Sequence, residues 1–131
     1  MAASLNRIFN LFDTVPDIQD TVSTKIKAPK SFDISFDNVH LSYDSSPVLN
    51  GLSFNAPHGK TTAIVGESGA GKSTLFNALT RLVDPKSGSI NIDGINTKNI
   101  SLENLRSLFS VVSQDALLFD ETLIENILLG N

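Results

Sequence analysis

The sequence has no cysteine, no long apolar run and no cluster of basic residues. Without cysteine, disulfide bonds, thiolate chemistry and cysteine-based zinc sites are excluded, and a reducing cytoplasmic compartment fits the composition. No stretch approaches the about 20 apolar residues of a membrane-spanning helix, and the N-terminus does not resemble a signal peptide. Ten basic and fourteen acidic residues among 131 are scattered, so we expect no nucleic-acid partner.

What the sequence does contain is a glycine-rich segment at residues 66–74. It satisfies the pattern G-x-x-x-x-G-K-[ST], in which backbone N–H groups converge on nucleotide phosphates at the start of a helix. Lys72 would add a positive charge, and the hydroxyl of Ser73 suits a Mg²⁺ ion that bridges the phosphates. The segment predicts binding of ATP or GTP. The candidate residues are Gly66, Glu67, Ser68, Gly69, Ala70, Gly71, Lys72, Ser73 and Thr74.

The surroundings of this segment distinguish a phosphate loop from a glycine-rich turn that matches the pattern by accident. Residues 62–65 form a short apolar run typical of a buried strand, and Leu75, Leu79 and Leu82 then recur at helical spacing. We expect this helix to end at residues 84–85, Asp-Pro. A strand, a glycine loop and a helix in this order favour the phosphate loop.

Other patterns predict an antiparallel sheet before the loop and short elements after it. Residues 32–36 and 39–43 alternate in opposite phase, which indicates two strand segments joined by a bulge or tight turn. A capping box, Thr122 with Glu125, opens a helix near the C-terminus. The remaining predicted elements are strands at 48–56, 89–94 and 109–113, and a helix at 101–108.

The chain divides into three parts on its sequence. Residues 1–12 carry Leu5, Ile8, Phe9 and Phe12 on one side of an amphipathic helix. Residues 13–31 mix charge with proline and read as a linker. Residues 32–131 then form the folded domain.

Taken together, the motifs resemble the nucleotide-binding domain of an ABC transporter of the exporter type, which follows a membrane domain on one polypeptide. The likeness extends from about Phe32 to Asn131. The matching elements are Tyr43, the phosphate loop, and residues 87–88, 92–94, 112–115, 118–119 and 124–127. The resemblance implies the N-terminal part of an α/β P-loop NTPase core of the ABC ATPase type, with an antiparallel β-subdomain. Residues 1–12 resemble the exit from the membrane domain.

The resemblance also implies roles for two residues outside the loop. Tyr43 matches the aromatic that stacks on adenine, whereas by itself it reads equally well as a sheet-surface aromatic. Gln114 matches the glutamine that approaches Mg²⁺ and the γ-phosphate and transmits the nucleotide state to the membrane domain; by itself it is a loop glutamine. The implied cofactors are ATP and Mg²⁺, with Ser73 and Gln114 as metal ligands.

No part of the sequence matches the family's signature, its Walker B strand or its switch histidine. Family members hydrolyse ATP in a head-to-tail pair of nucleotide-binding domains attached to transmembrane domains at the cytoplasmic face of a membrane. We therefore expect this chain to bind ATP without hydrolysing it, as part of an exporter. Two alternatives stay open: a non-catalytic module that pairs with a separate chain, and a fragment of a soluble ABC-type ATPase.

Overall fold

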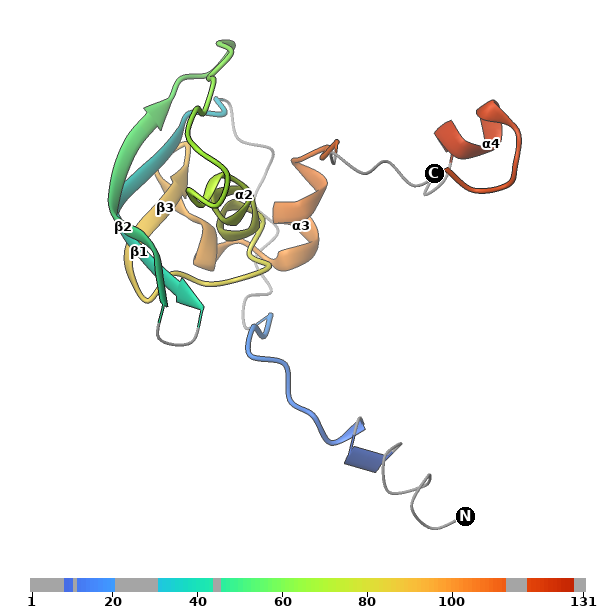
Figure 1. Ribbon diagram of the computed structural model, residues 1–131, viewed down its shortest axis with the longest axis horizontal. Helices are drawn as coiled ribbons and strands as arrows, with labels where there is room; N and C mark the ends of the chain where they lie inside the picture. Colours follow the sequence, from blue (N-terminus) through green and yellow to red (C-terminus); the bar gives the residue numbers. More distant parts are fainter. Residues whose placement is uncertain (1–8, 11, 21–30, 44–45, 113–117, 129–131) are drawn as a thin grey trace.

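The computed structural model describes residues 9–10, 12–20, 31–43, 46–112 and 118–128. A four-stranded antiparallel sheet with strand order β2-β1-β3-β4 is covered on one face by α2 and α3 (Figure 1). The elements are β1 (Ile34–Tyr43), β2 (Ser46–Ala56), α2 (Lys72–Leu79), β3 (Ser87–Ile92), β4 (Ile95–Asn96), a 3₁₀ turn (Thr97–Asn99), α3 (Leu102–Ser107) and α4 (Leu123–Leu128). The predicted α/β class with an antiparallel sheet is confirmed.

The predicted phase change lies within one strand, β1, as a bulge. The register with β2 shifts between Phe36 and Val39, and Asn38 takes a left-handed φ of 48°. The Asn38 N–H donates to the Ser53 hydroxyl at 2.8 Å instead of pairing in the ladder. Because the extra residue resets the alternation, Phe36, Val39 and Leu41 all point into the core.

The main core lies between the sheet and α2. Residues from three strands and from one face of the helix exclude water together, and the rings of Phe36 and Phe54 stack with centroids 4.7 Å apart. The buried members are Phe36, Val39, Leu41, Leu49, Leu75, Ala78, Leu79 and Ile90. A smaller cluster of Ile92, Ile100 and Leu105 attaches α3. The helix that follows the glycine-rich segment is thus held by the sheet.

The helix after the loop is shorter than predicted. It ends at Leu79, because Arg81 takes a left-handed φ of 51° and the chain closes a Schellman motif, with the Leu82 N–H donating to the Asn77 carbonyl at 2.8 Å. The end therefore comes before Asp84-Pro85. Leu82, which shares the helical spacing of Leu75 and Leu79 in the sequence, lies beyond the helix and is 59% exposed.

Two predicted strands are wrong. Among the described residues, no backbone hydrogen bond joins residues 62–65 to a neighbouring strand, and Val65 is 89% exposed. Residues 109–112 form no strand either, and Val111 and Val112 are exposed. An apolar run becomes a buried strand only where another strand pairs with it, and none of the described strands reaches these two segments.

The two ends of the chain are described only in part. Phe9, Asn10 and Phe12 are helical, and the rest of the predicted N-terminal helix lies outside the described residues. At the other end, the Thr122 hydroxyl and backbone N–H both donate to Glu125, which holds the pKa of Glu125 below its usual value and confirms the capping box. In the described parts of the chain, no helix has the length and apolar character to cross a membrane.

Candidate nucleotide-binding site

The glycine-rich segment leads directly into the first turn of α2. Gly71 is the N-cap residue with φ 84°, a left-handed conformation that favours glycine, and no side chain caps the helix. The first N–H groups of an α-helix have no partner within the helix, and the helix dipole adds positive potential there. The start of α2 is therefore suited to an anion.

Gly71 also brings the loop against β2. A Cβ atom at this position would lie 3.0 Å from Cγ1 of Val48 and 3.2 Å from the Val48 carbonyl oxygen. Gly69 has a similar φ of 82°, but a Cβ there would meet nothing within 4 Å. The two glycines therefore share a backbone requirement, and only Gly71 has a packing requirement.

This difference gives a matched prediction. Gly71→Ala and Gly69→Ala should each lose about 1–2 kcal/mol of unfolding free energy from left-handed strain, and Gly71→Ala a further 1–3 kcal/mol, roughly, from the contact with Val48. The loop should also shift in Gly71→Ala alone, which weakens nucleotide binding. Urea unfolding and ATP titration of both variants measure these effects. Equal losses in the two variants would contradict the close packing against β2.

The side chain of Lys72 bonds to the backbone at the start of its own loop. Its Nζ atom donates to the carbonyl oxygens of Gly66 at 2.7 Å and Glu67 at 2.5 Å. The Ala70 N–H donates to the Glu67 carbonyl at 3.2 Å, so the loop turns back upon itself. The ammonium group is thereby held within the curve of the backbone, where an anion would meet both its charge and the start of α2.

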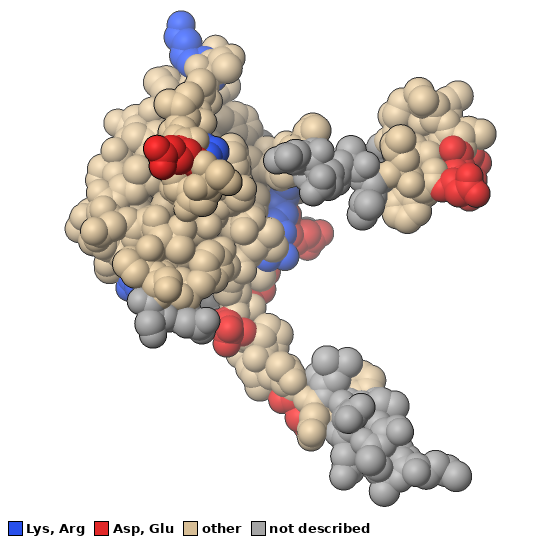
Figure 2. All heavy atoms as spheres, in the orientation of Figure 1, with Lys and Arg blue, Asp and Glu red and all other residues tan. Residues whose placement is uncertain are grey.

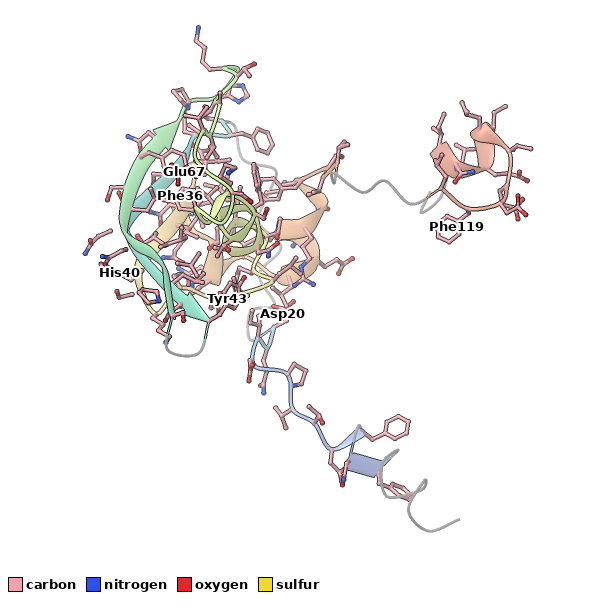
Figure 3. The ribbon with its side chains drawn as sticks, in the orientation of Figure 1. Asp20, Phe36, His40, Tyr43, Glu67 and Phe119 are labelled. Atoms are coloured by element: carbon pink, nitrogen blue, oxygen red, sulfur yellow. The ribbon has the colours of Figure 1, made fainter. Side chains whose placement is uncertain are left out.

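The loop forms one wall of a cavity of about 540 Å³. Tyr43, at the end of β1, also lines this cavity and is 44% exposed, so its ring is accessible to a ligand. Figure 3 labels Tyr43 near the lower edge of the sheet. The lining residues are Tyr43, Val48, Ser68, Gly69, Gly71, Lys72, Ser73 and Thr74. The fold thus brings an aromatic ring to the same cavity as the loop.

The predicted site and the lining of the cavity differ at two residues. Gln114 was predicted as a site residue but lies outside the described residues. Val48 lines the cavity but was missed by the sequence reasoning, because a valine in a strand carries no signal of a ligand. Of the predicted residues, Tyr43, Ser68, Gly69, Gly71, Lys72, Ser73 and Thr74 line one cavity, while Gly66 and Glu67 bind Lys72 through their carbonyls.

The chemistry of this lining fits a magnesium nucleotide. An ammonium group and an uncapped helix start suit phosphates, the Ser73 hydroxyl suits Mg²⁺, and an aromatic ring suits a base. In the described segments, no group of three or more His, Asp or Glu side chains could hold a metal by itself. Mg²⁺ here would take its other ligands from the phosphates and from water, as is usual for this ion.

A second cavity, of about 310 Å³, lies between the sheet and α2 on the side of residues 57–64. Its lining is mainly apolar and includes Phe32, Phe36 and Phe54. Such a lining suits packing by apolar side chains and offers few partners to phosphates. We therefore place the candidate site at the loop and not here.

Comparisons with known proteins agree with this geometry. The sequence model of the family described as "ABC transporter" matches residues 49–127. The chain is 44% identical over 130 residues to the human "Iron-sulfur clusters transporter ABCB7, mitochondrial". This alignment covers 97% of this chain and 17% of that protein. It is 37% identical over 128 residues to the "ATP-dependent lipid A-core flippase" of Desulfotalea psychrophila, covering 98% of this chain and 22% of that protein.

A solved structure of "a bacterial Atm1-family ABC exporter with ATP bound" is similar with a TM-score of 0.89 and 37% sequence identity. The similarity covers 99% of this chain and 23% of that one. The chain therefore spans about a fifth of the length of the relatives that it matches.

Proposed function

The chain belongs to the ABC transporter family, and we propose that it is the ATP-binding portion of an exporter and binds Mg-ATP in the cavity between Tyr43 and Lys72. The observation that carries this proposal is the convergence on one cavity of an aromatic ring, an ammonium group and an uncapped helix start. The ring suits the base of a nucleotide, and the ammonium group and the helix start suit its negatively charged phosphates. The ATP in the similar exporter structure is a further support.

At the phosphate end, the proposal gives each group of the chain a separate task. The N–H groups at the start of α2 donate to phosphate oxygens, and Lys72 neutralises charge while its bonds to Gly66 and Glu67 keep the loop curved. Ser73 and Gln114 are the proposed protein ligands of Mg²⁺. When bound, Mg²⁺ supplies positive charge that holds the phosphates in one orientation.

At the base end, Tyr43 is proposed to stack on adenine, and Val48 adds an apolar contact beside it. Since Tyr43 is only half-buried, Tyr43→Ala should weaken Mg-ATP binding by about tenfold, near the lower end of what base stacking contributes. Tyr43→Phe is the matched control, because it keeps the ring and removes only the hydroxyl, and it should bind like the wild type. A loss of affinity in Tyr43→Phe as large as in Tyr43→Ala would argue against stacking.

Hydrolysis requires more than this cavity supplies. Among the described residues that line it, none is acidic, and no carboxylate is there to act as the base toward an attacking water. We therefore propose that the chain alone binds ATP and that cleavage depends on groups from elsewhere in the protein or from a second nucleotide-binding domain. Turnover by the isolated chain comparable to that of complete exporters would contradict this part of the proposal.

Coupling to export is proposed from the organisation of the chain and its relatives. Residues 1–12 and 13–31 are proposed to lead from a transmembrane domain into the ATP-binding domain at the cytoplasmic face of a membrane. The names of the relatives differ in what is transported, iron-sulfur clusters in one and lipid A-core in another. We therefore propose ATP-driven export and name no transported substrate. Export assayed in membrane vesicles, with the intact protein and its Lys72→Ala variant, tests it.

A further inference from the structure

The N-terminal segment at residues 16–20, here called the strap, is attached to the domain at two places. Asp20 accepts a hydrogen bond from the backbone N–H of Leu102, the first residue of α3, at 3.0 Å through Oδ2. Pro16, Asp17 and Ile18 line a groove of about 490 Å³ on the domain. Figure 3 labels Asp20 where the extended segment meets the rounded body. The strap is therefore a docked segment over this length.

The remaining lining of the groove comes from residues 81–84, which follow α2, and from Arg106 of α3. Arg81 is 6% exposed and pairs with Asp84 through two bonds, from Nε to Oδ1 at 3.1 Å and from Nη2 to Oδ2 at 3.2 Å. Arg106, in α3, donates to the carbonyl oxygens of Thr80 at 3.2 Å and Arg81 at 2.9 Å. These carbonyls lie at the negative end of the α2 dipole, where a guanidinium is favourable.

The same contacts form a continuous physical link from the strap to the phosphate loop. Asp20 accepts from the first N–H of α3, and Arg106 of α3 donates to the carbonyl of Thr80, the C-cap residue of α2. The other end of α2 begins at Lys72. A helix of this length, about 12 Å, moves as one body. Figure 2 shows acidic atoms along the N-terminal segment and basic atoms at the adjoining edge of the body.

We propose that the strap is a coupling segment, whose docking through Asp20 positions α3 and α2 for nucleotide binding, so that strap docking and nucleotide binding strengthen each other. The proposal rests on the proposed function, since it needs ATP at the loop. Both events involve the same pair of helices from opposite ends, and coupling between two binding events is reciprocal. Displacing the strap should weaken nucleotide binding, and nucleotide should hold the strap more firmly.

The test uses the full chain and its Asp20→Ala, Asp20→Asn and Asp13→Ala variants. Amide hydrogen exchange at Leu102 reports docking, and Mg-ATP titration reports the loop. Asp20→Ala should speed exchange at Leu102 by about fivefold, as for loss of a helix cap, and weaken Mg-ATP binding by up to about the same factor. Asp20→Asn keeps a side-chain oxygen and should change both less. Asp13→Ala removes the same charge before the strap and should change neither.

A second variant isolates the link between the helices. In the wild type, Mg-ATP should slow exchange at Leu102, and Arg106→Gln, which removes the guanidinium from the Thr80 and Arg81 carbonyls, should abolish this response. Unchanged exchange in Asp20→Ala would overturn docking. Faster exchange with unchanged Mg-ATP affinity would overturn the coupling while leaving the proposed function intact. A wild type that binds no Mg-ATP would instead overturn the proposed function, and the coupling with it.

Discussion

Replacement of Lys72 by alanine is expected to weaken Mg-ATP binding by about 100-fold or more. Hydrogen bonds to charged groups contribute about 1.5–3 kcal/mol each, and the variant loses the ammonium that would meet the phosphates. It also loses the two bonds to the Gly66 and Glu67 carbonyls that curve the loop. Isothermal titration of the variant with Mg-ATP measures the effect. Unfolding by urea should change little, because the loop is largely exposed.

The matched control for this prediction is Lys60→Ala. Lys60 is exposed in the turn after β2 and does not line the nucleotide cavity. It carries the same charge, so general electrostatic attraction of ATP to the chain falls equally in the two variants. An affinity lost to the same degree in Lys60→Ala would show that the site is not the loop, and an unchanged affinity in Lys72→Ala would show the same.

Replacement of Gly88 by alanine is expected to lower the free energy of unfolding by about 2–5 kcal/mol. Gly88 has φ 85°, and a Cβ atom there would lie 2.3 Å from the carbonyl oxygen of Asn38 and 2.6 Å from that of Asp37. Both are backbone atoms of the bulge in β1, so the strands themselves must move. This expected loss is the sum of about 1–2 kcal/mol from left-handed strain and about 1–3 kcal/mol from overpacking.

Gly94→Ala separates these two contributions. Gly94 has a φ of 75° in the turn between β3 and β4, but a Cβ atom there would meet nothing within 4 Å. It should lose only the strain, about 1–2 kcal/mol. Urea unfolding of the two variants gives the difference directly. If both variants lose the same free energy, the contact between the bulge and Gly88 does not hold the sheet together.

Signals that act over a few residues predicted structure well. The bulge in β1 follows from a phase change in alternation between Phe36 and Val39, which a pleated strand can satisfy only with an extra residue. The capping box of Thr122 and Glu125 follows from side chains that reach backbone N–H groups three residues away. In each case both partners of the interaction lie in the same short stretch of sequence.

Signals that depend on a distant partner misled the prediction. Residues 62–65 and 109–112 have the composition of buried strands, yet strand formation needs a neighbour whose position the local sequence does not contain. The end of α2 was misplaced for a related reason. Arg81 at this end has a left-handed φ, and its carbonyl accepts from Arg106 of α3, a partner 25 residues away that the local sequence does not contain.

By itself, the sequence determined the glycine-rich loop pattern, the sheet class and the likeness to the ABC transporter family, because glycine spacing and alternation are local properties. Only the tertiary structure decided that Tyr43 and Val48 share a cavity with Lys72, and that Asp20 reaches the start of α3. These residues are far apart along the chain, and their meeting depends on how the sheet and the two helices pack. A pattern of residue types does not predict which distant residues meet, since this is set by packing across the whole domain.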